Sequence, residues 1–142
     1  MAVAKRLGAT DTVNSSDGKA SERIKEMTGG IGVDTAIEAV GIAATFALCQ
    51  AIIAPGGTIA NIGVHGKAVD LHLETLWDRN ITITTRLVDT ISTPMLLKTV
   101  GAHKIDPKLL ITHHFKLDRI LEAYETFAHA ADTGALKVVI EA

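Results

Sequence analysis

The side chains of this sequence that could do chemistry are few and form no recognisable catalytic group. Glu38 lies inside an otherwise apolar run, and because burying a carboxylate without partners is costly, we expect it to accept hydrogen bonds at a sheet edge. His113 and His114 are adjacent, but neighbours on an extended segment point to opposite faces, a poor geometry for chelation. His65 follows a run of strand character, which leaves a role in a ligand cleft open beside the simpler one of a solvated loop histidine. We therefore predict neither a catalytic residue nor a metal ligand.

Two apolar runs that end in glycine are the clearest sign of a binding edge. Residues 32–41 and 55–64 are short, rich in β-branched residues and bounded by glycine, which is typical of strands buried on both faces of a parallel sheet. In an open α/β sheet, ligands bind beyond the carboxyl ends of the strands, where a residue without Cβ lets the main chain approach them. Gly41 and Gly63 fit that position, although isolated glycines more often simply make turns.

The elements that must position these residues alternate along the chain. Helical patterns are predicted at 2–7, 19–27, 42–54, from Pro94 onward after a Thr93 cap, and after an Asp118 cap to residue 128. Extended segments are predicted at 11–14, 32–41, 55–64, 69–73, 81–88, 109–115 and 136–140. The order of strand, helix and strand indicates right-handed βαβ units, so the fold class is α/β with a parallel sheet.

Composition excludes several classes of protein. The chain has 142 residues, of which 47% are hydrophobic, enough for one domain with a sizeable core. Its net charge of −2 gives no basic surface, so no nucleic-acid partner is expected. The apolar runs are too short to span a bilayer and no signal peptide is recognisable, so we expect no membrane partner and a cytoplasmic location. The single cysteine, Cys49, is expected to be a buried structural thiol, and it excludes a disulfide or a cysteine-rich zinc cage within this chain.

The succession of short motifs resembles the zinc-dependent medium-chain alcohol dehydrogenases, most closely their bacterial secondary-alcohol branch. The motifs are Leu7-Gly8-Ala9-Thr10-Asp11, Gly32-Val33-Asp34, Glu38-Ala39-Val40-Gly41, Pro55-Gly56-Gly57, Asn61-Ile62-Gly63-Val64-His65-Gly66 and Ala135-Leu136-Lys137-Val138-Val139-Ile140. The resemblance implies a partial Rossmann-type doubly wound parallel sheet at 1–90, an NAD(P)-binding domain without its first βαβ half. It also implies that 91–142 is a C-terminal return segment belonging to the catalytic, GroES-like domain. The Gly-x-Gly-x-x-Gly turn and the zinc ligands of that family have no counterpart here, so we expect the C-terminal part of a longer enzyme, inactive alone.

The resemblance also implies which residues contact the cofactor, NAD or NADP. It places Ala39, Val40 and Gly41 near the adenosine half. It places Ile62, Gly63 and Val64 beside the nicotinamide carboxamide, with Leu87 and Val88 on the same side. Arg86 occupies a position where close relatives often have glycine, and Lys137 matches a basic residue that reaches a cofactor phosphate, against the simpler role of a solvated lysine.

The function implied for the full-length protein is hydride transfer between a small alcohol or ketone and the nicotinamide cofactor, with zinc polarising the alcohol oxygen. Two alternatives remain open. One is a noncatalytic half-Rossmann module that oligomerises, and the other is a fragment of a zinc-free, quinone reductase-like member of the superfamily. A homo-oligomer is expected in either case. The resemblance implies that strand 81–85 is the last strand of the cofactor domain and pairs with its two-fold mate, and a strand at a sheet edge offers unpaired main-chain groups for such pairing.

Overall fold

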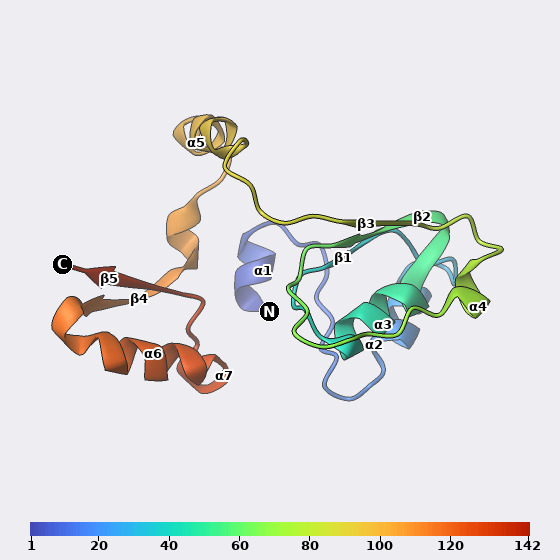
Figure 1. Ribbon diagram of the computed structural model, residues 1–142, viewed down its shortest axis with the longest axis horizontal. Helices are drawn as coiled ribbons and strands as arrows, with labels where there is room; N and C mark the ends of the chain where they lie inside the picture. Colours follow the sequence, from blue (N-terminus) through green and yellow to red (C-terminus); the bar gives the residue numbers. More distant parts are fainter. The chain divides into compact units, whose positions relative to one another are not determined.

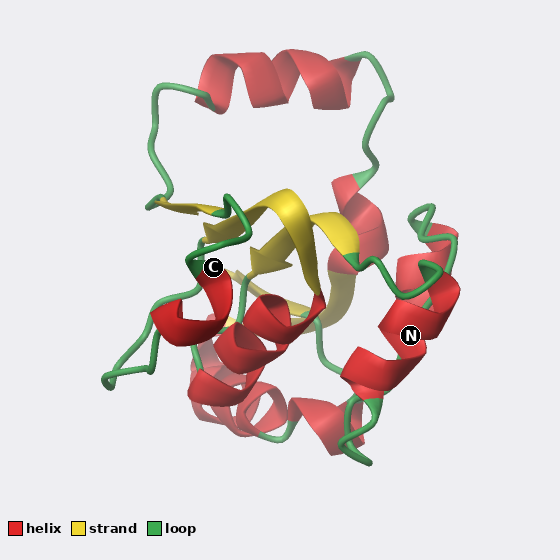
Figure 2. Cartoon of the chain, turned by 90° about the vertical axis from the view of Figure 1, so that its right-hand side faces the viewer, coloured by secondary structure: helices red, strands yellow, loops and turns green.

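The computed structural model describes residues 1–142 and divides into two compact units (Figure 1). The first comprises Met1 and Thr10–Asp89, and the second comprises Ala2–Ala9 and Thr90–Ala142. Each unit contains its own parallel sheet with helices beside it (Figure 1), which confirms the predicted α/β class. Figure 2 shows the mixture of helices, in red, and strands, in yellow. The assignment of the two parts to a cofactor domain and a catalytic domain stays a prediction.

The first unit is a βαβ arrangement with a three-stranded sheet. Its strands β1 (Val33–Glu38), β2 (Ile53–Asn61) and β3 (Thr82–Thr85) are parallel and lie in the order β1-β2-β3. Helices α2 (Ala20–Met27) and α3 (Ala43–Ile52) lie on the same face of this sheet (Figure 1). Short helix α4 (Leu73–Leu76) precedes β3. Because consecutive strands run parallel, their carboxyl ends meet at one edge of the unit.

The core of this unit lies between α3 and the covered face of the sheet. Ile53 and Ile59 of β2 are fully buried, and they pack with Phe46, Cys49 and Ile52 of α3. The expectation of a buried structural cysteine is confirmed, and burial raises the pKa of the Cys49 thiol. The opposite face is open, since Ile37 of β1 is largely exposed.

The predicted boundary between helix 42–54 and strand 55–64 is wrong. The helix ends at Ile52 and β2 already begins at Ile53, so Pro55-Gly56-Gly57 lies inside the strand rather than before it. Val33 pairs with Ile53 while Thr35 pairs with Thr58, so the register shifts there by a bulge. The Gly56 N–H donates to the Arg79 carbonyl oxygen at 2.7 Å. The Arg79 guanidinium in turn donates to the carbonyl oxygen of Ile53. These bonds replace the ladder bonds that a proline and a left-handed glycine cannot supply.

Two segments predicted to be strands have other conformations. Residues 69–72 are irregular because a side chain of α3 takes the place of a neighbouring strand. The Gln50 amide donates to the Asp70 carbonyl oxygen at 3.0 Å and accepts from the His72 N–H at 2.8 Å. Residues 11–14 also form no strand, since β1 pairs only with β2 and offers that segment no ladder.

The second unit contains a two-stranded parallel sheet. Its elements are α1 (Ala2–Arg6), α5 (Thr93–Gly101), η1 (Pro107–Leu110), β4 (Ile111–Lys116), η2 (Leu117–Arg119), α6 (Ile120–Ala128), α7 (Ala130–Thr133) and β5 (Lys137–Glu141), with β4 paired to β5. The predicted caps are displaced: Thr93 is the first residue of α5 rather than its cap, and Asp118 lies in η2, two residues before α6 begins. None of the helices has the length and apolar character needed to cross a bilayer.

The Gln50 bridge gives a stability prediction. Replacing Gln50 by leucine removes two side-chain hydrogen bonds, to the Asp70 carbonyl and from the His72 N–H. Each such bond contributes about 0.5–1.5 kcal/mol, so we expect the free energy of unfolding to fall by about 1–3 kcal/mol. Urea denaturation followed by circular dichroism measures this, with Glu22→Leu at an exposed position of α2 as the control. Equal stability of the two variants would contradict the assigned role.

Candidate functional site

The carboxyl ends of β1 and β2 bring together two of the segments that the resemblance singled out. Residues 39–41 follow β1, and residues 62–64 follow β2. The N–H groups of Ile62 and Gly63 both donate to the main-chain carbonyl oxygen of Glu38, at 2.8 and 3.0 Å. The two segments are therefore tied to each other through the last residue of β1.

Glycine is required at positions 41 and 63 because of steric contacts that the sequence did not reveal. A Cβ on Gly41, whose φ is +86°, would overlap the main chain of Val64, and a Cβ on Gly63 would overlap the Glu38 carboxylate and the Gly41 nitrogen. Both glycines therefore permit the close contact of two strand-end segments.

Glu38 lies at the centre of this contact and is only 1% exposed. Its Oε1 accepts hydrogen bonds from the N–H groups of Val40 and Gly41, each at 2.9 Å, and from the Thr45 hydroxyl at 2.6 Å. Burial alone would raise the pKa of this carboxyl, but the bonds from Thr45, Gly41 and Val40, with His65 nearby, outweigh it and hold the pKa below its usual value. The expectation that Glu38 accepts hydrogen bonds at the sheet edge is confirmed.

His65 is fixed rather than solvated. Its Nε2 lies 2.8 Å from Asn61 Oδ1 and 3.3 Å from Glu38 Oε2, and its ring meets Phe46 edge to face. The Asn61 amide nitrogen donates to the Gly63 carbonyl oxygen at 3.1 Å, which leaves its oxygen facing His65. Sequence reasoning missed Asn61 and Thr45, because only the fold brings them to Glu38.

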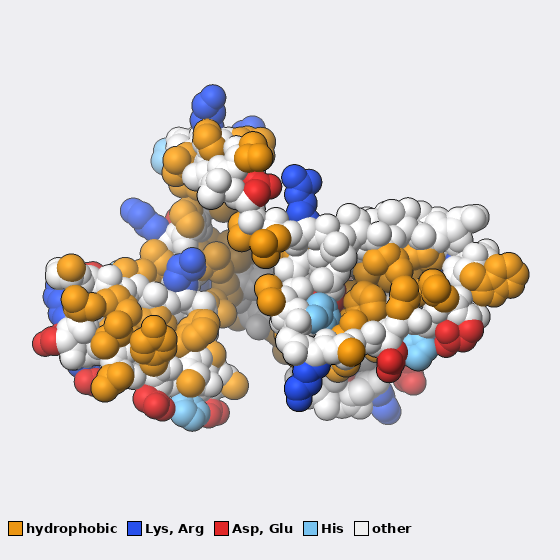
Figure 3. Space-filling model, in the orientation of Figure 1, with side chains coloured by type: hydrophobic (Ala, Val, Ile, Leu, Met, Phe, Trp, Pro, Cys, Tyr) orange, Lys and Arg blue, Asp and Glu red, His pale blue; other side chains and the backbone are white.

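The outer surface of this edge is apolar and open. Exposed aliphatic side chains follow the carboxyl ends of all three strands: Val40, Ile62, Val64, Leu87 and Val88. Val88 is 90% exposed and Val64 78% exposed, so these side chains are free to pack against a ligand. We call these five residues the apolar edge. In Figure 3, orange hydrophobic side chains also gather on the first unit, to the right of the view.

Arg86 is accommodated without the conformational freedom of glycine. Its N–H donates to the Asn61 carbonyl oxygen at 3.2 Å, which extends the pairing of β3 with β2, and its φ is not positive. The guanidinium lies 3.5 Å from the Asp89 carboxylate. The main chain therefore reaches Leu87 along a regular path.

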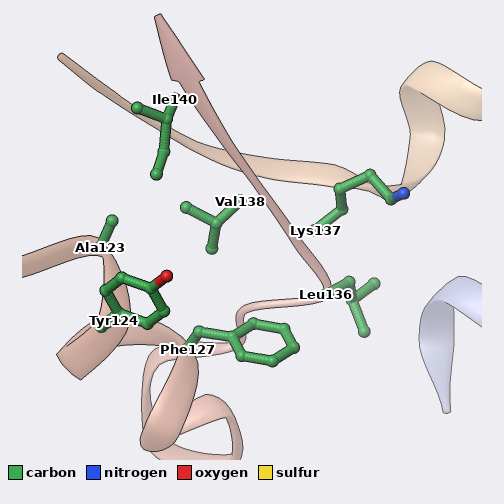
Figure 4. Close-up of a pocket in the computed structure, with 7 residues that line it drawn as sticks. All are labelled: Ala123, Tyr124, Phe127, Leu136, Lys137, Val138 and Ile140. Carbon is green, nitrogen blue, oxygen red and sulfur yellow. The ribbon is translucent and has the colours of Figure 1, made fainter. Parts of the chain in front are cut away.

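Lys137 belongs to the second unit, whereas the other expected cofactor contacts belong to the first. It begins β5 and pairs with Ile111 of β4. Figure 4 shows Val138 and Ile140 pointing toward Tyr124 of α6, while the Lys137 side chain extends away from Tyr124 and Phe127. These residues line a hollow of about 480 Å³. The Lys137 amine is exposed, and a phosphate contact stays a prediction.

The side chains of this chain do not fit a zinc site. No three His, Cys, Asp or Glu side chains gather where they could hold a metal ion. His114 instead contacts Glu141 at 3.1 Å, while His113 contacts the Thr112 hydroxyl at 3.0 Å. Catalytic zinc needs three protein ligands, and the side chains of this chain do not supply such a set.

The glycine contacts predict a selective loss of stability. Gly63→Ala forces a methyl group against the Glu38 carboxylate and the Gly41 main chain, so we expect a loss of about 2 kcal/mol or more in unfolding free energy. Gly66→Ala is the matched control, since a Cβ there meets nothing and its φ is not left-handed. Thermal denaturation of the two variants checks the difference, and similar midpoints would rule out the tight contact.

Comparison with known proteins places the chain among the dehydrogenases. The family model described as "Zinc-binding dehydrogenase" matches residues 1–102. An NADP-dependent isopropanol dehydrogenase from Thermoanaerobacter brockii is 38% identical over 128 residues, covering 85% of this chain and 36% of the relative. An alcohol dehydrogenase from Cupriavidus necator is 31% identical over 143 residues, covering 98% of this chain and 39% of the relative.

A solved structure gives the same result. The apo form of zinc dependent alcohol dehydrogenase 2 from Streptococcus pneumonia is 56% identical, with a TM-score of 0.94, and the match covers 99% of this chain and 41% of that one. The chain thus spans about two fifths of the length of the relatives it matches. The resemblance found in the sequence is confirmed, and the chain belongs to the zinc-binding dehydrogenase family.

Proposed function

We propose that this chain supplies one side of the nicotinamide cofactor site of an NAD(P)-dependent alcohol dehydrogenase. The observation that carries the proposal is the apolar edge, which lies at the carboxyl ends of three parallel strands and rests on segments tied together by Glu38. Ligands of open α/β sheets bind at this position. The substrate class would be a small alcohol or ketone, in keeping with the isopropanol dehydrogenase among the relatives.

The residues of this chain would bind and orient the cofactor rather than react with it. When bound, a nicotinamide ring accepts or donates the hydride. Val64, Leu87 and Val88 offer aliphatic surface that would cover one face of the ring and exclude water from it. The N–H groups of Ile62 and Gly63 are engaged by Glu38, so this segment would offer main-chain carbonyl groups to the carboxamide. Residues 39–41 would lie on the adenosine side of the cofactor.

Titration with NADP, and separately with NAD, tests the proposal. The sequence contains no Gly-x-Gly-x-x-Gly turn to hold a pyrophosphate, so we expect weak binding with a dissociation constant on the order of 1 mM. Amide chemical shifts in NMR spectra of the whole chain should change at residues 39–41 and 62–64.

Two exposed aliphatic residues of the first unit give a matched pair of variants. Val64→Glu places a negative charge on the apolar edge and should abolish these shift changes, whereas Ile31→Glu, at the amino-terminal side of β1, should leave them intact. The proposed site would be refuted if the Val64→Glu variant showed the same shift changes as the wild type. It would also be refuted if the wild type showed no shift changes at millimolar cofactor.

One observation favours self-association, the feature that the noncatalytic alternative also requires. β3 lies at the end of the strand order, so one of its edges is unpaired. The Arg86 N–H points to β2, and the alternation of main-chain groups along a strand therefore directs the Ile83 N–H to the free edge. Such an edge is a natural site for pairing with a second copy of the chain.

Ile83→Pro tests association through β3. Proline removes one donor from the free edge and none from the ladder with β2, so we expect the oligomer to dissociate while the circular dichroism spectrum is retained. Thr84→Pro is the contrasting variant, because its N–H faces β2 and its loss should lower the thermal midpoint. Light scattering at several concentrations measures the assembly. A wild-type monomer at high concentration would refute association, and an oligomer indifferent to Ile83→Pro would move the interface elsewhere.

A further inference from the structure

We propose that Glu38 is a positioning residue whose two carboxylate oxygens hold segments 39–41 and 62–65 in a fixed arrangement beneath the apolar edge. The inference rests on the proposed function only in treating this edge as the cofactor side. The arrangement itself is a property of the chain, and it can be tested without any ligand.

The polar groups in direct contact with the Glu38 carboxylate can all donate a hydrogen to it. Oε1 receives two main-chain N–H groups and the Thr45 hydroxyl. Oε2 has no hydrogen-bond partner of normal geometry, yet it is buried and lies 3.3 Å from His65 Nε2. The titratable groups that face Glu38 are His65 and the Cys49 thiol of α3.

The neighbours of His65 determine which of its ring nitrogens carries the proton. Because the Asn61 amide nitrogen donates to the Gly63 carbonyl oxygen, Asn61 presents its oxygen to His65 Nε2. Two acceptors, Asn61 Oδ1 and Glu38 Oε2, therefore face the same nitrogen, so Nε2 carries a hydrogen. The imidazole donates into the space between residues 38 and 61 and so links segment 62–65 to the Glu38 side chain.

Only a carboxylate offers an acceptor oxygen both to the N–H groups of Val40 and Gly41 and to the Nε2–H of His65. A glutamine at position 38 would place its NH₂ group either against the N–H groups of Val40 and Gly41 or against the Nε2–H of His65. A protonated carboxylic acid meets the same conflict with its O–H. Loss of the charge therefore sets one segment against a donor and leaves the other with a weaker, uncharged acceptor, so both segments loosen while the main chain of β1 and β2 remains paired.

Glu38→Gln is the test, with amide hydrogen exchange of the full chain as the readout. Leaving a buried donor unsatisfied is expected to speed exchange at Val40, Gly41, Ile62 and Gly63 by about tenfold or more, while amides of β2 at residues 58–60 keep their protection. The matched control is Glu74→Gln, which removes the charge from an exposed His72–Glu74 pair of the same unit.

His65→Phe separates the two sides of the contact. It keeps the aromatic packing against Phe46 but removes the donor, so it should deprotect Ile62 and Gly63 and leave Val40 and Gly41 unchanged. Unchanged protection of Ile62 and Gly63 in Glu38→Gln would overturn the proposal. Equal deprotection of the whole β1–β2 ladder would also overturn it, because that result indicates general destabilisation.

A pH series on the wild-type chain decides the matter if Glu38→Gln fails to fold. The pKa of Glu38 in the folded chain lies below its ordinary value of 4.5, so its contribution is complete above that value and is lost as the pH falls through the lowered pKa. Both segments should lose protection together in that range, and losses at separate pH values would overturn the proposal.

An NADP titration of the same variants keeps the two proposals distinct. Both the positioning role and the proposed function are supported if amide exchange changes as expected and Glu38→Gln, but not Glu74→Gln, weakens NADP binding. Exchange as expected with no NADP binding to the wild type supports the positioning role and refutes the proposed function alone.

Discussion

The burial of one ionised carboxylate at the end of β1 is the constraint on which the binding edge depends. A charge removed from water must be surrounded by donors, and Glu38 draws these donors from its own following residues, from α3 and from the segment after β2. His65 can face Oε2 only if the two strand-end segments come into contact, and this contact requires glycine at positions 41 and 63. One electrostatic requirement thus determines both the path of the main chain and the choice of residue at two positions.

The sequence predicted the order of the elements well because hydrophobic periodicity and glycine breaks are local signals. It failed where contacts distant in sequence decide the conformation. Pro55-Gly56-Gly57 resembles a break before a strand, but Arg79 supplies hydrogen bonds that keep the segment within β2. Residues 69–73 alternate like an edge strand, yet the Gln50 side chain of α3 occupies their main-chain groups. Neither partner is visible in a local window.

The site shows the same division. Glu38 could be recognised from sequence as an anomaly, since a lone carboxylate within an apolar run demands partners. The segments that follow β1 and β2 could be singled out through family resemblance. The participation of Thr45, Asn61 and His65 could not, because it depends on how α3 and the segment after β2 turn toward the same point. A threonine or asparagine at such a position carries no distinguishing local pattern.

The Gln50 bridge has a consequence for sequence divergence. Its amide binds main-chain atoms of residues 70 and 72, so the contact does not depend on the side chains at those positions, except that proline at 72 would remove the N–H. The segment can therefore accept substitutions over evolutionary time without losing its anchorage, provided the glutamine itself is kept. Such an anchored but variable stretch is a natural place for relatives to differ and for an engineer to graft new sequence.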